Sequence, residues 1–147
     1  LARKWGRIVN ITTSFSTMIR GGNMPYGMTK SALEAGTASW SVDLAGTGVT
    51  ANVLIPGGAA DTTMIPQDVM PDRGKLVPAN AMQAPIVFLA SAASDGVTGK
   101  RFIAQFFDAA KPLASPGCAG VAWPELAAAS SQGIGEDDAN RKAGKSG

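Results

Sequence analysis

A tyrosine and a lysine one helical turn apart are the side chains in this sequence best suited to chemistry. Tyr26 is the single tyrosine of the chain, and Lys30 follows four residues later. Residues at this spacing share one face of a helix, so the ammonium of Lys30 would lie near the phenol of Tyr26. A nearby cation favours the phenolate, and a tyrosine can then exchange protons near neutral pH without histidine. A helix with a half-buried tyrosine and an exposed lysine gives the same pattern, so the surrounding elements must decide.

Hydroxyl side chains follow the first predicted strand. The β-branched run over residues 7–12 predicts a buried strand, and Thr13 and Ser14 come directly after it. Open parallel sheets bind their ligands at the carboxyl edge, where a hydroxyl can donate to a substrate oxygen. Turn chemistry, with hydrogen bonds to the local backbone, explains the same hydroxyls without catalysis.

The elements around these residues predict a βαβ unit. Residues 26–45 carry small and apolar side chains at helical spacing, and the apolar run 49–55 fits a parallel strand covered on both faces. Strand, helix and strand in this order form a right-handed crossover. Pro56 and Gly57 then end the second strand abruptly.

The rest of the chain predicts two loops, one more helix and one more strand. Residues 13–24 have no sustained period and predict a loop, and the proline-containing stretch 59–78 predicts a long irregular flap. A helix is expected over 79–92, kinked or begun at Pro85, and a strand over 101–104. The methionines at positions 18, 24, 64 and 70 either line an apolar pocket or serve ordinary packing.

Composition excludes several kinds of site. The 147 residues suffice for one modest domain, and the absence of histidine excludes Ser-His-Asp triads, Cys-His pairs and histidine-ligated metals. The lone Cys118 can form neither an internal disulfide nor a thiolate zinc site, so we expect no bound metal. A net charge of +2 does not favour a nucleic-acid partner. No apolar run is long enough to span a membrane and no signal peptide opens the sequence, so we expect a cytoplasmic protein.

Four segments together resemble the short-chain dehydrogenase/reductase family over about residues 6–107. In order they are Gly6–Ile11 leading into hydroxyl residues, Tyr26-x-x-x-Lys30-Ser31-Ala32-Leu33-Glu34, Asn52–Gly57, and Val97-Thr98-Gly99. The resemblance implies an α/β fold with a parallel sheet, the C-terminal part of a doubly wound Rossmann-type domain. The domain would cover residues 1–108, followed by an Ala/Gly/Ser-rich tail over 109–147 that we expect to be largely disordered.

The resemblance also implies an activity: an NAD- or NADP-dependent oxidoreductase that interconverts an alcohol and a carbonyl compound. Tyr26 would be the acid/base, and Lys30 would favour its phenolate and bind the nicotinamide ribose. Thr13 stands at the spacing where the family usually has serine, with Ser14 as the competing hydroxyl. The nicotinamide would be lined by residues after the second strand: Pro56, Gly57, Gly58, Ala59 and Thr62, with Thr63 as an alternative to Thr62.

Two segments of the sequence depart from the family pattern. The usual Asp-Gly-Gly after the last strand is replaced by residues 105–108, Gln-Phe-Phe-Asp. The glycine-rich phosphate-binding turn has no counterpart, because the G-x-G-x-x-A string at residues 46–51 precedes a strand instead of following one. The chain also begins without methionine, so we expect it to be the later part of a longer protein whose missing half selects NAD or NADP.

Two interpretations of function therefore remain. The first is the oxidoreductase, acting on a small-molecule alcohol or ketone and forming a homo-oligomer through the helices at 26–45 and 79–92, as the family commonly does. The second is a truncated, non-catalytic remnant that serves as an oligomerisation or interaction module through the helix at 26–45.

Overall fold

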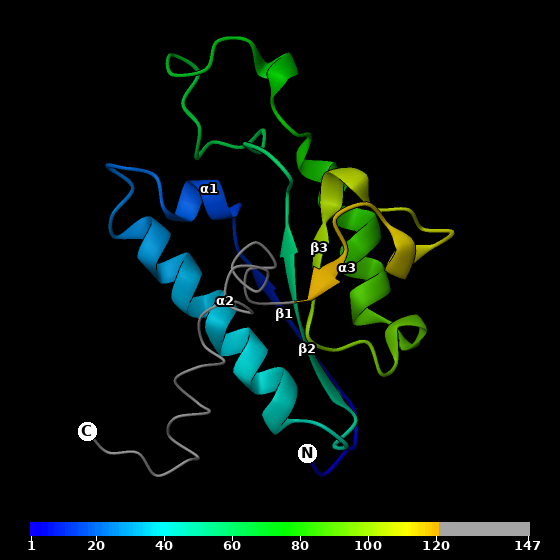
Figure 1. The fold of residues 1–147 in the computed structure, drawn as a ribbon. Helices are drawn as coiled ribbons and strands as arrows, with labels where there is room; N and C mark the ends of the chain where they lie inside the picture. Colours follow the sequence, from blue (N-terminus) through cyan, green and yellow to red (C-terminus); the bar gives the residue numbers. More distant parts are fainter. Residues whose placement is uncertain (121–147) are drawn as a thin grey trace, which may run out of the picture.

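The computed structural model describes residues 1–120 of the chain, in which helices pack on both faces of a small sheet (Figure 1). The expected disorder of the tail falls mostly on residues 121–147, which lie outside the described residues. The first part of that stretch, residues 109–120, contains a 3-10 turn at Pro112–Ala114 and the short strand β4 (Ala119–Gly120).

The sheet is built around β2 (Val49–Ile55), which lies between β1 (Gly6–Ile11) and β3 (Lys100–Ile103). Both pairings are parallel, with Val9 opposite Asn52 and Leu54 opposite Phe102. β4 pairs antiparallel with the far side of β3. The three predicted strands are therefore present and parallel, and the fold is α/β as expected, with β4 as an additional edge strand.

Two helices cover opposite faces of this sheet (Figure 1). α2 (Tyr26–Asp43) connects β1 to β2 on one face, and α3 (Gln83–Ala90) lies on the other. The predicted helix over 79–92 is divided in the structure. A 3-10 turn at Ala79–Met82 precedes α3, and Pro85 falls in the first turn of α3, where its missing N–H leaves no helical hydrogen bond unmade.

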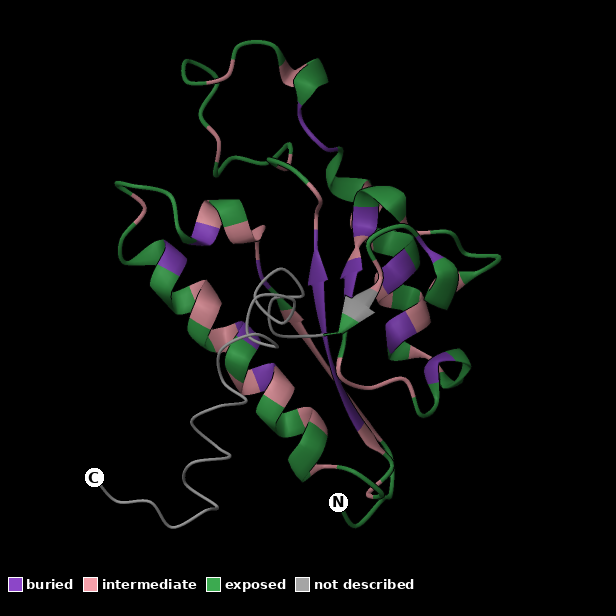
Figure 2. Cartoon of the chain, in the orientation of Figure 1, coloured by how far each residue is buried: buried purple, intermediate pink, exposed green. Residues whose placement is uncertain are grey.

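The two faces of the sheet are chemically different. Beneath α3, an apolar core centres on Leu54, Leu89 and Phe102, and the rings of Phe88 and Phe107 pack against Phe102. Figure 2 shows β2 buried along most of its length in the middle of the molecule. Beneath α2, buried polar side chains from the strands meet polar side chains from the helix, which gives that interface directional contacts.

One of those directional contacts joins the middle of α2 to β1. The amide of Asn10 in β1 donates to the hydroxyl of Thr37 at 2.8 Å, and that hydroxyl in turn donates to the carbonyl of Leu33 at 2.7 Å. Thr37 is fully buried. Because a hydrogen bond fixes orientation as well as distance, this pair sets how α2 lies along β1.

The segment predicted as a loop over 13–24 contains a short helix, α1 (Phe15–Met18). Ser14 caps it, since its side chain accepts a hydrogen bond from the backbone N–H of Thr17 at 3.2 Å. The only sequence signal for this helix is the cap itself, because a four-residue helix is too short to show a hydrophobic period.

The predicted flap over 59–78 is long, as expected, but its two ends are joined. Ala60 and Val77 form a parallel bridge, with the N–H of Val77 donating to the carbonyl of Ala59 at 2.8 Å. Arg73 binds the carboxylate of Asp61 through its Nε at 2.8 Å and donates to the carbonyl of Ile65 at 2.7 Å. The flap is therefore a closed loop held by its own residues.

Candidate functional site

A cavity of about 640 Å³ opens at the carboxyl edge of the parallel strands. This is the edge at which open α/β sheets bind ligands, and the volume is in the range of small-molecule sites. The end of β1, the α1 segment, the start of α2 and the chain after β2 form its walls. The residues that line it are Ile11, Thr12, Thr13, Ser14, Thr17, Arg20, Asn23, Tyr26, Lys30, Pro56, Gly57, Gly58, Ala59, Ala60, Thr62, Met64 and Ile65.

Tyr26 and Lys30 face this cavity together from the first turns of α2. The Lys30 ammonium lies 5.8 Å from the centroid of the Tyr26 ring, as the spacing predicts for one helix face. Lys30 Nζ also donates to the carbonyl of Ile11 at 2.9 Å. This bond ties the lysine to the last residue of β1 and holds its charge beside the phenol. Tyr26 as a whole residue is 39% exposed to solvent.

A glycine lets the start of α2 approach α1 closely enough to place Tyr26. A Cβ atom on Gly27 would lie 2.0 Å from the carbonyl oxygen of Met18, a distance that no side chain can occupy. Met18 is buried beneath this contact. The position of Tyr26 relative to the end of β1 therefore depends on the absence of a side chain at the next residue.

The two candidate hydroxyls differ in what they contact. Ser14 Oγ caps α1 and lies 2.8 Å from the hydroxyl of Thr17. Thr13 is half-buried at the cavity wall, and its side chain forms no hydrogen bond within residues 1–120. Its backbone carbonyl accepts a hydrogen bond from Arg101 Nη2 at 3.2 Å. The hydroxyl of Thr13 is thus available for a ligand, whereas that of Ser14 already has a structural role.

A buried ion pair supports this wall from behind. Arg101 Nε in β3 lies 2.9 Å from Glu34 Oε1 in α2, and the two side chains are only 8% and 0% exposed. The other oxygen of Glu34 accepts a hydrogen bond from the hydroxyl of Thr12 at 3.0 Å. The pair therefore connects α2 and β3 to both residues that follow β1, and it fixes the backbone that carries the Thr13 side chain.

The opposite wall is formed by backbone with few bulky side chains. Gly57 adopts a φ of +102°, and a Cβ there would lie 2.7 Å from Ile103 Cγ2. A Cβ on Gly58 would lie 2.9 Å from a methyl group of Val77. Glycine is therefore required twice for the chain to turn between β3 and the flap. The turn leaves main chain, with the small side chain of Ala59, along the cavity.

The structure brings all the predicted site residues to one cavity: Thr13, Ser14, Tyr26, Lys30, Pro56, Gly57, Gly58, Ala59 and Thr62. Thr62 lines it and Thr63 does not. Of the four methionines, only Met64 lines it. Thr17, Arg20 and Asn23 also line the cavity and were not predicted from the sequence, where they fall in the segment interpreted as a loop. A cap at Ser14 followed by a threonine three residues later was the one available signal.

Two other segments named in the sequence analysis, Asn52–Gly57 and Val97-Thr98-Gly99, carry side chains that hold the backbone in place. Asn52 donates to the carbonyl of Val97 at 2.7 Å and accepts from the N–H of Lys100 at 3.0 Å. Thr98 Oγ1 accepts from the N–H of Ala51 at 3.1 Å. These side chains hold the turn before β3 against β2. The string at residues 46–51 forms the turn into β2, as its position in the sequence predicts, so it opens no helix.

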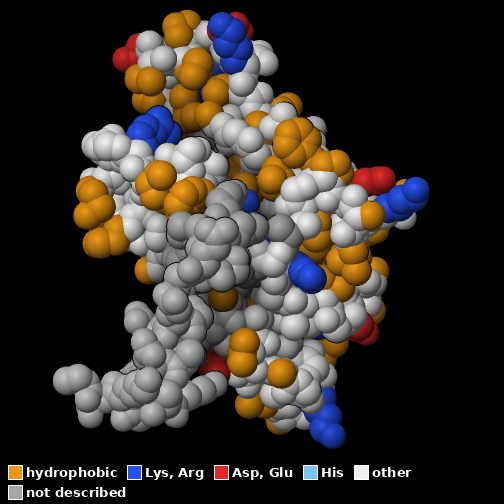
Figure 3. Space-filling view, viewed as in Figure 1, with side chains coloured by type: hydrophobic (Ala, Val, Ile, Leu, Met, Phe, Trp, Pro, Cys, Tyr) orange, Lys and Arg blue, Asp and Glu red, His pale blue; other side chains and the backbone are white. Residues whose placement is uncertain are grey.

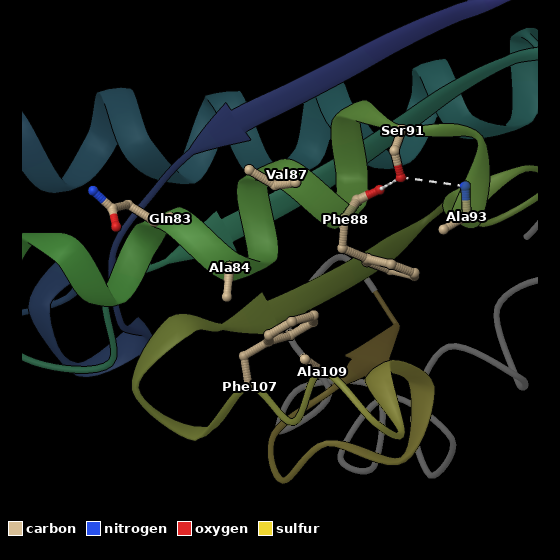
Figure 4. Close-up of a pocket in the computed structure, with 8 residues that line it drawn as sticks. All are labelled: Gln83, Ala84, Val87, Phe88, Ser91, Ala93, Phe107 and Ala109. Atoms are coloured by element: carbon tan, nitrogen blue, oxygen red, sulfur yellow. Dashed lines mark hydrogen bonds between the residues drawn. The ribbon is translucent and has the colours of Figure 1, made fainter.

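A second hollow, of about 580 Å³, lies on the outer side of α3 (Figure 4). Val87 and Phe88 of α3 border it. The ring of Phe107 packs beside the ring of Phe88, with 5.8 Å between the two ring centroids. The hydroxyl of Ser91 donates to the carbonyl of Phe88 and accepts from the N–H of Ala93. This groove has no titratable side chain in its lining, so it offers packing and not chemistry.

Within residues 1–120, no helix is long and apolar enough to cross a membrane. The same part of the chain contains no group of three or more His, Cys, Asp or Glu side chains arranged to hold a metal ion.

Comparison with known proteins supports the family and the fold. The family model described as enoyl-(acyl carrier protein) reductase matches residues 1–105. The chain belongs to the short-chain dehydrogenase/reductase family. A solved structure named only as a member of that family is 31% identical to it, with a TM-score of 0.59 over 69% of this chain and 45% of the other.

Two further relatives show similar levels of likeness. A gluconate 5-dehydrogenase from Burkholderia cenocepacia, solved with NADP and tartrate, is 30% identical over 69% of this chain and 44% of its own, with a TM-score of 0.59. A curated relative, the uncharacterized oxidoreductase YjdA of Bacillus subtilis, is 32% identical over 65% of this chain and 40% of its own length. The chain thus spans less than half of the length of each of these three relatives.

Proposed function

We propose that this chain carries the catalytic residues of an NAD- or NADP-dependent oxidoreductase that interconverts an alcohol and a carbonyl compound. The observation that carries this proposal is the meeting of Tyr26, Lys30 and Thr13 at one cavity at the carboxyl edge of the sheet. Membership of the short-chain dehydrogenase/reductase family supports the reaction class, and relatives solved with NADP support the cofactor.

The residues along the cavity fit the nicotinamide end of such a dinucleotide. Lys30 offers a cationic donor for ribose hydroxyls, and the backbone from Pro56 to Ala59 leaves an unobstructed wall for a planar ring. When bound, the nicotinamide would supply or accept the hydride. The described residues fit only this end of the cofactor. The glycine-containing string at residues 46–51 lies at the start of β2, whereas the cavity lies at the end of β2, so this string cannot bind the phosphates of the same nucleotide.

The chain's own groups would handle the proton. The hydroxyl of Thr13 donates to the substrate oxygen and orients it, and the phenol of Tyr26 gives that oxygen a proton in reduction or takes one in oxidation. The ammonium of Lys30 lies 5.8 Å from the centroid of the Tyr26 ring, on the same face of the helix. Ser14, which caps α1, is assigned a structural role.

Two variants of the full-length protein test this assignment. Tyr26→Phe keeps the ring but removes the exchangeable proton, so NADH or NADPH should bind with unchanged affinity while turnover of a ketone panel falls by about 10²–10⁴-fold. Lys30→Met should weaken nucleotide binding as well. Lys75→Met, in the flap and outside the cavity, is the matched control and should change neither. Retention of turnover by Tyr26→Phe would falsify the assignment.

Self-association is a second candidate function, favoured by the exposed apolar residues of both helices. Val42 of α2 is 73% exposed, and Val87, beside the groove on α3, is 67% exposed. Such residues lose contact with water when a second copy packs on them. Light scattering of the purified protein should show an oligomer that Val87→Asp or Val42→Asp dissociates. A non-catalytic interaction module would keep this assembly but bind neither nucleotide.

A further inference from the structure

The cavity contains a second cation that the proposed hydride chemistry does not use. Lys30 and Arg20 are the two charged side chains among its lining residues, and no aspartate or glutamate accompanies them. Arg7, Arg73 and Arg101 each form an ion pair with a carboxylate. Within residues 1–120, Arg20 forms none. An exposed guanidinium without a carboxylate partner can bind an anionic group of a ligand, often through two hydrogen bonds at once.

Arg20 stands at the end of a row of polar side chains along the cavity. Ser14, Thr17 and Arg20 follow one another at intervals of three residues and all line it. The hydroxyl of Thr17 lies 2.8 Å from that of Ser14. Arg20 Nη2 donates to the Thr17 hydroxyl at 3.5 Å. Asn23 Nδ2 donates to the carbonyl of Thr17 at 2.6 Å and holds the chain after α1 in place. One wall of the cavity is therefore polar and cationic.

The wall formed by the flap is apolar. Met64 lines the cavity and is 78% exposed, and Ile65 lies beside it. Figure 3 shows apolar side chains gathered over the flap, residues 59–78, at the top of the molecule. A large apolar side chain at the mouth of a cavity gains most from covering an apolar part of a ligand, and the flexible thioether adapts to its shape.

We propose that Arg20 determines specificity by binding an anionic group, a carboxylate or a phosphate, on a substrate whose remaining part is apolar. The polar row holds the guanidinium at one wall, and Met64 covers the apolar part at the other. The inference rests on the proposed function only in taking this cavity as the place where the substrate binds. The expected substrate of the proposed oxidoreductase is therefore an anionic hydroxy or oxo compound with an apolar chain.

Paired ligands that differ in the anionic group test this inference without turnover. The probes are 2-oxooctanoate with 2-octanone, and octyl phosphate with 1-octanol, titrated calorimetrically into the full-length protein with and without NADP⁺. The wild-type protein should bind one anionic probe at least about tenfold more tightly than its neutral partner, the effect expected of a charge-assisted hydrogen bond. The pair that shows the preference tells a carboxylate from a phosphate.

Two variants assign that preference to its residue. Arg20→Gln should reduce it to less than about threefold and leave the neutral probes unaffected. Arg3→Gln, which changes an exposed arginine outside the cavity, should keep it. Absence of any preference in the wild-type protein, or its persistence in Arg20→Gln, would overturn the inference.

The nucleotide gives the remaining arm of the experiment. NADH and NADPH should bind Arg20→Gln as they bind the wild-type protein. A selective loss of nucleotide affinity would assign Arg20 to a cofactor phosphate and overturn the inference. If neither nucleotide binds the wild-type protein, the proposed oxidoreductase fails, while the probe pairs without NADP⁺ still report whether Arg20 recognises an anion.

Discussion

The guanidinium of Arg101 and the carboxylate of Glu34 form an ion pair that is almost completely removed from solvent, with 2.9 Å between Nε and Oε1. The two residues come from β3 and α2. Through Thr12 and the carbonyl of Thr13, the pair holds the strand end that carries the proposed substrate-binding hydroxyl. A charged group deep in the fold is thus placed directly behind the candidate site.

Removal of one member of this pair should be costly. Arg101→Met removes the buried guanidinium that pairs with the Glu34 carboxylate, so we expect the free energy of unfolding to fall by about 3–5 kcal/mol. The double variant Glu34→Leu/Arg101→Met buries no charge and should recover part of that loss. Urea denaturation of the three proteins measures both effects. A double variant less stable than Arg101→Met would contradict the explanation.

Two glycines of α2 should respond in opposite directions to the same substitution. Gly27→Ala places a methyl group against the carbonyl of Met18 and should destabilise the protein by about 1–3 kcal/mol, with a loss of turnover as Tyr26 shifts. Gly36→Ala meets no atom within 4 Å and should stabilise the helix by about 0.5–1 kcal/mol. Thermal unfolding compares them, and equal effects of the two would show that the approach of α1 to α2 is not tight.

The neighbouring hydroxyls Thr13 and Ser14 should separate activity from stability. Thr13→Val removes a hydroxyl without a partner in the described residues and should reduce turnover while leaving stability nearly unchanged. Ser14→Ala removes the cap of α1 and should lower the free energy of unfolding by about 1 kcal/mol while turnover largely persists. Steady-state kinetics measure the turnover of both variants, and denaturation measures their stability. Loss of turnover in Ser14→Ala but not in Thr13→Val would instead assign the binding of the substrate oxygen to Ser14.

The single cysteine provides a test by pH. Burial raises the pKa of the Cys118 thiol, and the positive charge of Lys100 opposes this only in part. Alkylation by iodoacetamide just above neutral pH should therefore be slower in the native protein than in urea. Because the native state holds this proton more tightly than the unfolded chain, stability should fall as the pH rises from the thiol's ordinary pKa towards its raised value. Cys118→Ala should remove that part of the pH dependence.

Much of the fold follows from local patterns, as particular elements show. The continuous apolar run of β2 and the helical spacing after Tyr26 gave element boundaries within two residues of the structure at each end. The resemblance to the family placed Pro56–Gly58 at one site with Thr13 and Tyr26, and all of these residues line the same cavity. The cavity lies at the carboxyl edge of the parallel strands, where sheets of this kind bind ligands.

The features that escaped prediction depend on contacts between distant residues or on very short segments. Nothing near Glu34 in the sequence indicates that its partner is Arg101, because the pairing exists only when α2 packs on the sheet. α1 has four residues and shows no period. Arg20, read as part of a loop, reaches the cavity only because α1 and the bond from Asn23 direct the chain back towards β1.

The bridge between Ala60 and Val77 joins the two ends of the segment between them. Since Ala60 and Val77 pair with each other outside the named strands, the stretch between them starts and ends at one place, and a change in its length should cost little in loop entropy. The cavity wall that carries Thr62, Met64 and Ile65 could therefore be altered between these two anchors without a change in α2.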